Sequence, residues 1–479
     1  MSLSDPKYLV FLAATVLVFY LLRGHWPRAA MLLGASYGFY FNLSGYYEFV
    51  LFFVTAVAYT GGLLLSWSAQ AHQRGMVFAA CSVVLLAPLI VFKYLGFIFG
   101  IVSTAVGSTT PVLMLALPIG ISFFTFAALG YLIDVYLEVI EPERRPIEFA
   151  LYVAFFPLVT AGPIERGGHF LPQFDFGLQR FSSDRAIAAC RLIILGLFLK
   201  LFCADTLVTP VNAIFADPAH FVALEKLFGL IYFMFYIYSD FAGYSLIAIG
   251  SGLLFGLEVL PNFRQPFLST TVPEFWRNWH MSLSNWVRDY LFTPLHMHWR
   301  RNGNLGLVAA LMISFLVLGI WHGAGWGFVL FGLMHGLLVT GSTLTLKYRD
   351  ALASWVGTPQ LIVRASRIVS TFLLVMLTFV VYRANSMHDA MLIYSDIFSN
   401  NVFRNHFYDH DAFNVIDIKS PTWLVVGAVI ASYVLPSRGV FLEKQPIVVQ
   451  MFAYNVGAAL VLYGWVAHTA APPFLYYRF

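Results

Sequence analysis

The sequence has little charge. Only 11% of its 479 residues are charged and 59% are apolar, whereas soluble domains carry about 25% charged residues. This composition excludes a water-soluble domain. The formal net charge of +4 is small, and basic residues in membrane proteins mark topology before they mark nucleic acid, so we expect no nucleic-acid partner.

Several other signals are absent. There is no run of alternating strands of the kind that an outer-membrane barrel shows, and no low-complexity segment. The three cysteines, Cys81, Cys190 and Cys203, lie in apolar stretches without metal-ligand spacing, which excludes a disulfide framework and predicts no metal site. Asp5 and Lys7 precede the first apolar run without a basic region, so no cleaved signal peptide is expected. The sequence predicts an all-α polytopic membrane protein.

The apolar segments vary in length around the roughly 20 residues that a span needs. Segment 149–162 is short and ends in Gly162-Pro163, which favours a re-entrant hairpin. Segment 224–256 is too long for one straight span, and Gly323, Gly325 and Gly327 divide 305–346 into two helices. The expected segments are 8–22, 29–43, 46–67, 76–103, 113–137, 149–162, 186–207, 224–256, 305–346, 368–384, 422–436 and 448–467.

The distribution of Lys and Arg predicts the topology. Most of them fall in loops that alternate with a second set of loops poor in these residues, which places the richer set in the cytoplasm. Both termini and the loop 385–421 then lie on the opposite, extracytoplasmic side.

Residues 262–304 interrupt the apolar pattern. Pro273 and Glu274 favour a helix start, and apolar side chains follow at helical spacing. We expect a basic, Trp-rich helix at the cytoplasmic interface, whose simplest role is to anchor the chain at the membrane surface. His280 and Asp289 are polar residues that such an anchor does not explain. The apolar positions are Phe275, Trp279, Leu283, Trp286 and Tyr290.

A second polar position is His322 in WHGAGWG, residues 321–327. An ionisable residue at membrane depth indicates a functional site, although a lone buried histidine is more often a hydrogen-bonded core residue. His335 is interpreted as a helix-packing residue. Asp240, with Ser239 and Ser245, either lines a path or ties helices together, and for Asp134 the second role is favoured.

Six motifs in this order resemble the membrane-bound O-acyltransferase (MBOAT) family, and within it the bacterial branch of the alginate O-acetylation protein and the teichoic-acid D-alanyl exporter. The resemblance covers roughly residues 30–385 and implies a ring of roughly 11–13 helices with re-entrant segments around a central funnel, open to an acyl donor from the cytoplasm. The motifs are LPIGISFFTF (117–126), YLIDVY (131–136), FFPLVTAGPIER (155–166), YSDFAGYSLIAIG (238–250), FWRNWHMSLSNWVRDY (275–290) and GIWHGAGW (319–326).

The resemblance assigns roles to residues. It implies that His322 is the catalytic histidine and His280 the second polar residue of the site. A histidine with an unperturbed pKa near 6.5 can take the proton of an attacking hydroxyl at neutral pH. Arg264, Arg277 and Arg288 either meet the phosphates of coenzyme A or only set the topology. The expected donor-binding or tunnel residues are Arg277, Trp279, Ser282, Trp286, Arg288, Asp289, Asp240, Tyr244 and Trp321.

The sequence ends PPFLYYRF, residues 472–479. Its last six residues resemble the F-x-Y-[FY]-x-F motif of a small partner of the D-alanyl exporter, which in some relatives is fused to the acyltransferase. That resemblance makes Tyr476 a covalent acyl carrier. The chain then divides into a transmembrane acyltransferase domain, 1–467, and an extracytoplasmic acyl-relay motif, 468–479. The alternative is an aromatic anchor for the last helix.

The resemblance implies an O-acyltransferase of the bacterial inner membrane that moves acetyl from acetyl-CoA, with no bound cofactor, to an envelope polysaccharide or a periplasmic SGNH-type O-acetyltransferase. Alginate, cellulose, peptidoglycan and secondary wall polymers stay open as acceptors. The alternatives are D-alanyl or other acyl transfer from an acyl carrier protein, lipid acylation, and a channel that only conducts an acyl donor. The loop 385–421 is expected to dock the partner. The alternative for its polar residues is a solvated face, and a metal site is not favoured: His406, Asp409, His410 and Asp411.

Overall fold

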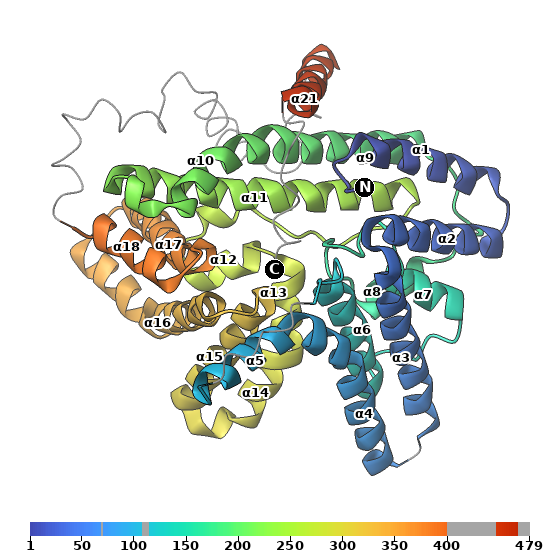
Figure 1. Cartoon of the computed structure of the whole chain (residues 1–479), viewed down its shortest axis with the longest axis horizontal. Helices are drawn as coiled ribbons and strands as arrows, with labels where there is room; N and C mark the ends of the chain where they lie inside the picture. Colours follow the sequence, from blue (N-terminus) through green and yellow to red (C-terminus); the bar gives the residue numbers. More distant parts are fainter. Residues whose placement is uncertain (69, 108–114, 400–446, 468–479) are drawn as a thin grey trace. The chain divides into compact units, whose positions relative to one another are not determined.

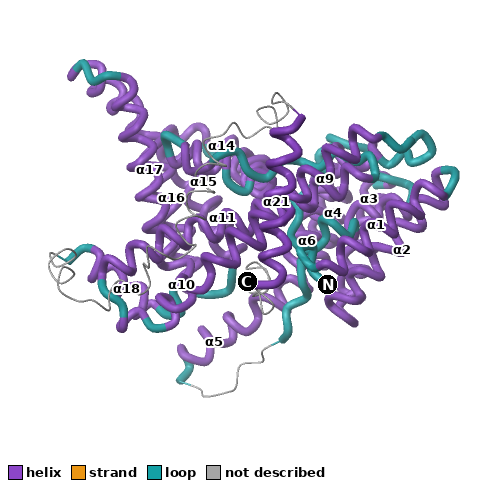
Figure 2. Tube along the Cα trace, turned by 90° about the horizontal axis from the view of Figure 1, so that it is seen from above, coloured by secondary structure: helices purple, strands orange, loops and turns teal. Residues whose placement is uncertain are grey.

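The computed structural model describes residues 1–68, 70–107, 115–399 and 447–467. Every regular element in these ranges is a helix (Figures 1 and 2). Within the described residues, seven continuous helical stretches are long and apolar enough to cross a membrane, and three shorter apolar helices accompany them. The prediction of an all-α polytopic membrane protein is confirmed. The seven stretches are His25–Trp67, Ala71–Ala105, Ser183–Ala216, Ala223–Leu254, Arg300–His322, Trp326–Val356 and Gln360–Arg383.

The α-helices, in chain order, are α1 Pro6–Leu21, α2 His25–Ser44, α3 Glu48–Trp67, α4 Ala71–Leu89, α5 Leu95–Ala105, α6 Ile121–Tyr136, α7 Pro146–Ala154, α8 Gly167–Phe170, α9 Ser183–Leu197, α10 Asp205–Ala216, α11 Ala223–Leu254, α12 Val272–Asn278, α13 Met281–Val287, α14 Thr293–His298, α15 Gly303–His322, α16 Trp326–Val356, α17 Gln360–Arg383, α18 Met387–Ile397 and α21 Ile447–Ala467. Wider π-helical turns continue three of them: Ile90–Tyr94, Phe198–Ala204 and Arg288–Phe292.

The chain forms two compact units. The first comprises Met1–Gly196 and Tyr244–Pro261, and the second comprises Leu197–Gly243 and Asn262–Phe479. Helix α11 contributes its first part to the second unit and its last part to the first.

In the first unit, α3 packs against α4, α6 and α7. Helix α7 has only nine residues, and buried turns follow it from 155 to 163. This agrees with the prediction that 149–162 does not cross the membrane as one helix. Gly120 (φ +80°) lies against these turns, where an added Cβ atom would stand 2.3 Å from the Val159 carbonyl oxygen. Only glycine fits there.

In the second unit, α15 and α16 pack closely as a hairpin, and α17 packs against α16. Gly319 and Gly332 face each other: a Cβ atom on Gly319 would stand 2.7 Å from the Gly332 Cα atom. Small residues allow this backbone approach between helices in a membrane. The predicted division of 305–346 into two helices is confirmed, with the break at 323–325.

Segment 224–256, expected to be too long for one straight span, forms the helix α11 of 32 residues, more than the roughly 20 that a span needs. One local prediction needs correction. The helix expected from Pro273 to Tyr290 is not continuous, because it breaks between α12 and α13 at His280, whose φ is +44°. The cause is the segment 262–264, which exchanges backbone hydrogen bonds with Asn278 and Met281 (both 2.9 Å). The tryptophans of this segment are buried rather than placed at a membrane surface: Trp276, Trp279 and Trp286.

Candidate functional site

His322 is the last residue of α15, and its side chain is 3% exposed. Its ring contacts the edges or faces of three aromatic rings, Trp321 (centroids 5.0 Å apart), Phe331 (5.8 Å) and Tyr382 (5.4 Å). These come from α15, α16 and α17. The chain turns directly after the histidine at Gly323, where a Cβ atom would overlap the Phe328 ring at 2.2 Å. The glycine therefore lets the chain turn beside a packed ring.

His280 lies in the break between α12 and α13 and is fully buried. Its ring packs on Phe241 (4.6 Å) and on Trp321 (5.7 Å). Since Trp321 also contacts His322, one indole ring joins the two histidines that the sequence singled out. Burial lowers the pKa of His280 to about 3, so its imidazole is neutral at pH 7.

The side chain of Asn262 is hydrogen bonded to the His280 ring. Its Oδ1 atom lies 3.1 Å from His280 Nδ1, 2.9 Å from Ser282 Oγ and 3.3 Å from the Ser282 backbone nitrogen. The predicted site residue Ser282 therefore reaches the histidine through Asn262. Asn262 is a site residue that the sequence analysis missed, because an asparagine between Pro261 and Phe263 looks like an ordinary turn residue.

His335 on α16 has a different environment. Its Nδ1 atom accepts from Trp276 Nε1 (3.1 Å), and its Nε2 atom lies 2.8 Å from Thr378 Oγ1, which donates to the Val375 carbonyl. Because Nδ1 accepts, the proton of the neutral ring is on Nε2. These bonds connect α12, α16 and α17, in agreement with the predicted packing role.

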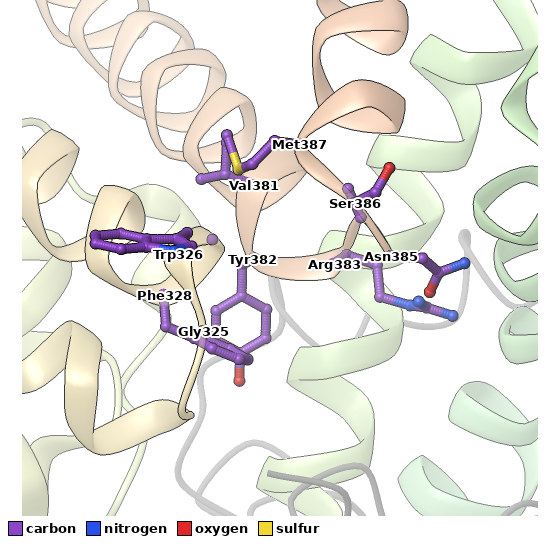
Figure 3. A pocket seen from close by; sticks show the side chains of 11 residues that line it. Gly325, Trp326, Phe328, Val381, Tyr382, Arg383, Asn385, Ser386 and Met387 are labelled. Atoms are coloured by element: carbon purple, nitrogen blue, oxygen red, sulfur yellow. The ribbon is translucent and has the colours of Figure 1, made fainter. Parts of the chain in front are cut away.

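A hollow of about 450 Å³ lies beside the catalytic candidate. Figure 3 shows Trp326 and Arg383 on opposite sides of Tyr382, the residue whose ring also contacts His322. Arg383 is held by Asn212 Oδ1 (2.8 Å) and lies over the Phe215 ring. The lining residues are Gly325, Trp326, Gly327, Phe328, Val381, Tyr382, Arg383, Ala384, Asn385, Ser386 and Met387.

A smaller hollow of about 150 Å³ is lined by residues of α12, α13, α15 and α16 and of the π-helical turn after α13. Arg277 and Arg288, both exposed, stand among its lining residues, and Leu318 is about one helical turn before His322. Leu311, Phe315 and Leu318 of α15 contribute to its apolar lining. The lining residues are Pro273, Trp276, Arg277, Ser284, Asn285, Val287, Arg288, Phe292, Leu311, Ser314, Phe315, Leu318 and Val339.

The remaining predicted tunnel residues differ in position. Trp279 is buried and stacks on Phe275 (5.5 Å), and Trp286 is buried beside Tyr290 (5.1 Å). Asp289 is exposed and pairs with Arg288 (2.8 Å).

Asp240 on α11 is buried and pairs with Lys200 (2.9 Å), which also binds Asp205 (2.7 Å). This ion pair joins α11 to the turn between α9 and α10. The sequence analysis missed Lys200, although a lysine inside the apolar run 186–207 is the kind of residue that indicates a buried partner.

Three predictions fall elsewhere. Tyr244 belongs to the first unit, where its hydroxyl is hydrogen bonded to that of Thr160. Tyr476 lies outside the described residues, as do His406, Asp409, His410 and Asp411. Of the loop 385–421, the described part contains the helix α18. Among the described residues, no group of three or more His, Cys, Asp or Glu is arranged to hold a metal ion.

The fold and the site define a multi-pass helical membrane protein with two buried histidines around one tryptophan. Residues 144–382 match the model of the membrane-bound O-acyltransferase family. The chain is 34% identical over 412 residues to the probable alginate O-acetylase AlgI of Pseudomonas aeruginosa, an alignment that covers 83% of this chain and 75% of the relative.

Two further relatives carry other names. The peptidoglycan O-acetyltransferase of Helicobacter pylori is 32% identical over 274 residues, 52% of each chain. The teichoic acid D-alanyltransferase of Bacillus subtilis is 26% identical over 310 residues, 62% of this chain and 75% of that one. The chain belongs to the membrane-bound O-acyltransferase family, and it is a membrane O-acyltransferase.

Proposed function

We propose that this enzyme moves an acetyl group from cytoplasmic acetyl-CoA, through His322 and an ester on Tyr476, to an envelope polysaccharide or to a periplasmic SGNH-type transferase. The proposal places the enzyme in the bacterial inner membrane with both termini on the extracytoplasmic side. The names of the relatives, an alginate O-acetylase and a peptidoglycan O-acetyltransferase, support acetyl as the group that is transferred.

One observation carries the proposal: residues next to His322 line two hollows, Leu318, one helical turn before it, the smaller one and Tyr382, whose ring contacts His322, the larger one. Leu311 and Leu318 line the smaller hollow, and Gly325 begins the larger one. With Arg300 and Arg301 on the cytoplasmic side, α15 runs outward and places the smaller hollow toward the cytoplasm. A donor and an acceptor then approach His322 from opposite sides of the membrane.

The smaller hollow suits the acyl donor. In this proposal the pantetheine arm lies along the apolar side chains of the hollow, and the guanidinium groups of Arg277 and Arg288, which are among its lining residues, bind the phosphates of coenzyme A. The larger hollow suits the acyl acceptor, since it has an aromatic wall and adjoins Tyr382 beside His322.

In the first transfer, His322 takes the proton of the Tyr476 hydroxyl while the phenolic oxygen bonds to the acyl carbon. The carbon–sulfur bond breaks, and the thiolate of coenzyme A recovers the proton from the imidazolium. The products are acetyl-tyrosine and free coenzyme A. A phenol has a pKa of about 10, so its ester is a better acyl donor than an alkyl ester.

In the second transfer, a hydroxyl of the sugar or of the partner enzyme attacks the tyrosyl ester, and the tyrosine hydroxyl is regenerated. The acetyl group crosses the membrane while the donor stays in the cytoplasm. The loop 385–421 is the proposed docking place for the partner. Deletion of 400–421 is expected to abolish polymer acetylation while labelling of Tyr476 continues; intact polymer acetylation would contradict the docking proposal.

The relay is tested by mass spectrometry of the C-terminal peptide after incubation of the purified enzyme with isotope-labelled acetyl-CoA. We expect label on Tyr476 in the parent, none in His322→Ala and none in Tyr476→Phe. Tyr477→Phe is the matched control, because it removes the neighbouring phenol and keeps the relay. Label that persists in His322→Ala would overturn the role of the histidine. Acetyl transfer to the acceptor with no label on Tyr476 would overturn the tail relay.

The relative named as a teichoic acid D-alanyltransferase supports a second candidate, transfer of D-alanine from an acyl carrier protein. The same peptide distinguishes the two candidates, since the alanyl ester and the acetyl ester differ in mass. A channel that only conducts an acyl donor is the third reading, and it predicts flux that survives His322→Ala.

A further inference from the structure

The side chain of Asn262 is buried and meets three groups with one atom. Its Oδ1 atom lies within hydrogen-bonding distance of the Ser282 backbone nitrogen, the Ser282 hydroxyl and His280 Nδ1. The backbone N–H of Ser282 only donates, so the atom that faces it is the amide oxygen and not the amide nitrogen. This contact fixes the orientation of the asparagine side chain.

The orientation of Asn262 settles the tautomer of His280. An amide oxygen only accepts hydrogen bonds, so His280 Nδ1 must carry the proton that points to it. In the neutral imidazole, Nε2 then holds the lone pair. Nε2 is therefore the acceptor nitrogen of His280, and Asn262 contacts the other nitrogen, Nδ1.

We propose that Asn262 is a positioning residue that holds His280 in the Nδ1–H tautomer, so that Nε2 accepts the hydrogen bond of a reacting group during acyl transfer. The inference rests on the proposed function, because it takes His280 to be part of the acyl-transfer site that Trp321 and His322 form. Neither the tail relay nor the identity of the acyl group enters it.

The backbone of Asn262 supports the same arrangement. Its carbonyl accepts from the Met281 nitrogen (2.9 Å), and the Arg264 nitrogen donates to the Asn278 carbonyl (2.9 Å). These two bonds enclose His280, which has the left-handed φ of +44° that a residue with a side chain adopts at a cost. Asn262 therefore fixes the backbone of His280 through its carbonyl and the imidazole through its amide.

Two substitutions test the proposal. Asn262→Leu keeps the volume and removes the acceptor, so we expect the rate of acyl transfer to fall about 10- to 100-fold. Asn262→Asp keeps an acceptor for all three donors and adds a negative charge beside Nδ1, which stabilises the imidazolium and raises the pKa of His280. The imidazolium carries a proton on Nε2 and loses its acceptor. The activity of Asn262→Asp should therefore rise with pH as His280 loses its second proton, over a pH range in which the activity of the parent changes less.

The other ionisable groups near His280 are unchanged in both variants. His322 lies across the Trp321 ring, and Asp240 is next to Phe241 and paired with Lys200. Asn278→Ala is the matched control, because it lies in the same segment and loses only a side-chain bond to Ser269 (3.2 Å). It should keep the pH profile of the parent.

Nitrogen-15 spectra of histidine-labelled enzyme in bilayers give a readout that does not depend on activity. The His280 signals are assigned by their loss in His280→Gln. We expect a protonated Nδ1 and an unprotonated Nε2 in the parent and in Asn278→Ala. In Asn262→Leu we expect a different distribution of the proton between the two ring nitrogens. If Asn262→Leu does not fold, the pH profile and the nitrogen-15 spectrum of Asn262→Asp still test the role of Asn262.

A parent His280 protonated only on Nε2, or an Asn262→Asp enzyme with the pH profile of the parent, would overturn the inference. Failure of the proposed function looks different, because His322→Ala would then still form product. An inactive His322→Ala enzyme together with a parent-like Asn262→Asp enzyme would overturn the role of Asn262 alone.

Discussion

Among the buried histidines of the described part of the second unit, His335 and His322 differ in what surrounds the ring. His335 gives both nitrogens to hydrogen bonds with side chains, one from Trp276 and one to Thr378, and it lies among packed helices. His322 lies at the end of a helix, before a glycine turn, within an aromatic cage that adjoins a hollow. The two are almost equally buried, so burial alone does not distinguish the proposed catalytic histidine from the one that packs helices together.

The difference is instructive because both histidines sit in apolar helices and neither is explained by hydropathy. A side chain that ties three helices together is retained for stability, since each bond it makes leaves a buried partner unsatisfied when it is removed. A ring at a turn beside open volume has room for a reacting group to approach. Substitutions at the two positions should therefore separate activity from stability.

The largest expected effect is on activity at His322. His322→Gln keeps the size and polarity of the side chain and removes the base, so acyl transfer should fall about 10³-fold, within the range that general-base catalysis contributes. The thermal unfolding midpoint in detergent should stay close to that of the parent. A variant that retains more than about a tenth of the parent rate would assign the proton transfer to another group.

A large stability effect is expected at Lys200. Lys200→Met leaves Asp205 and Asp240 buried without their cation, which costs about 3–5 kcal/mol when a buried ion pair is broken. Thermal unfolding checks the loss, and adding Asp240→Asn should recover part of it. Lys226→Met is the matched control, because its partner Asp396 is partly exposed and remains hydrated. Equal losses in the two lysine variants would show that burial of the carboxylates does not govern the cost.

The sequence predicted the helical class and the hairpin at 323–325, because these depend on hydropathy and on glycines. His280 and His322 were singled out as ionisable residues in apolar surroundings, and only the family resemblance assigned them to one site. The sequence also predicted a continuous helix over 273–290, because helical spacing is a local signal. The break at His280 comes from backbone hydrogen bonds that residues 278 and 281 make with residues 262–264. Backbone pairing between two segments does not depend on the spacing of their apolar side chains, so the hydrophobic pattern of the sequence does not indicate it.

The dependence on contacts between distant segments also explains why the sequence did not reveal the roles of Asn262 and Asp240. The role of Asn262 depends on three donors that converge on one oxygen, which no spacing indicates. The sequence left two roles open for Asp240, lining a path or tying helices. In the structure its carboxylate is paired with Lys200, a lysine that the sequence analysis did not connect with it. Contacts between distant segments decide such cases.

A moderate effect on stability is expected at His335. His335→Leu leaves Trp276 Nε1 without its acceptor, at about 1–3 kcal/mol for a buried unsatisfied group, while Thr378 Oγ1 still donates to the Val375 carbonyl. The rate per folded enzyme should fall less than tenfold. Combining His335→Leu with Trp276→Phe should restore some stability, because the unsatisfied indole N–H is removed. Unfolding midpoints and initial rates measured on the same samples check both parts, and a rate loss as large as that of His322→Gln would remove the distinction between the two histidines.

The smallest expected effect is at Arg277, which lines the smaller hollow and is exposed. An exposed charge contact contributes little, so Arg277→Ala should raise the KM for acetyl-CoA about fivefold and leave kcat and stability nearly unchanged. The comparison becomes sharper with acetyl-pantetheine, a donor without phosphates, for which the parent and Arg277→Ala should have similar KM values. Arg300→Ala is the control, since Arg300 is also basic and exposed but does not line the hollow. If both arginine variants kept the parent KM for acetyl-CoA, the role of Arg277 would be limited to setting the membrane topology. The phosphates of the donor would then have to be bound by other residues.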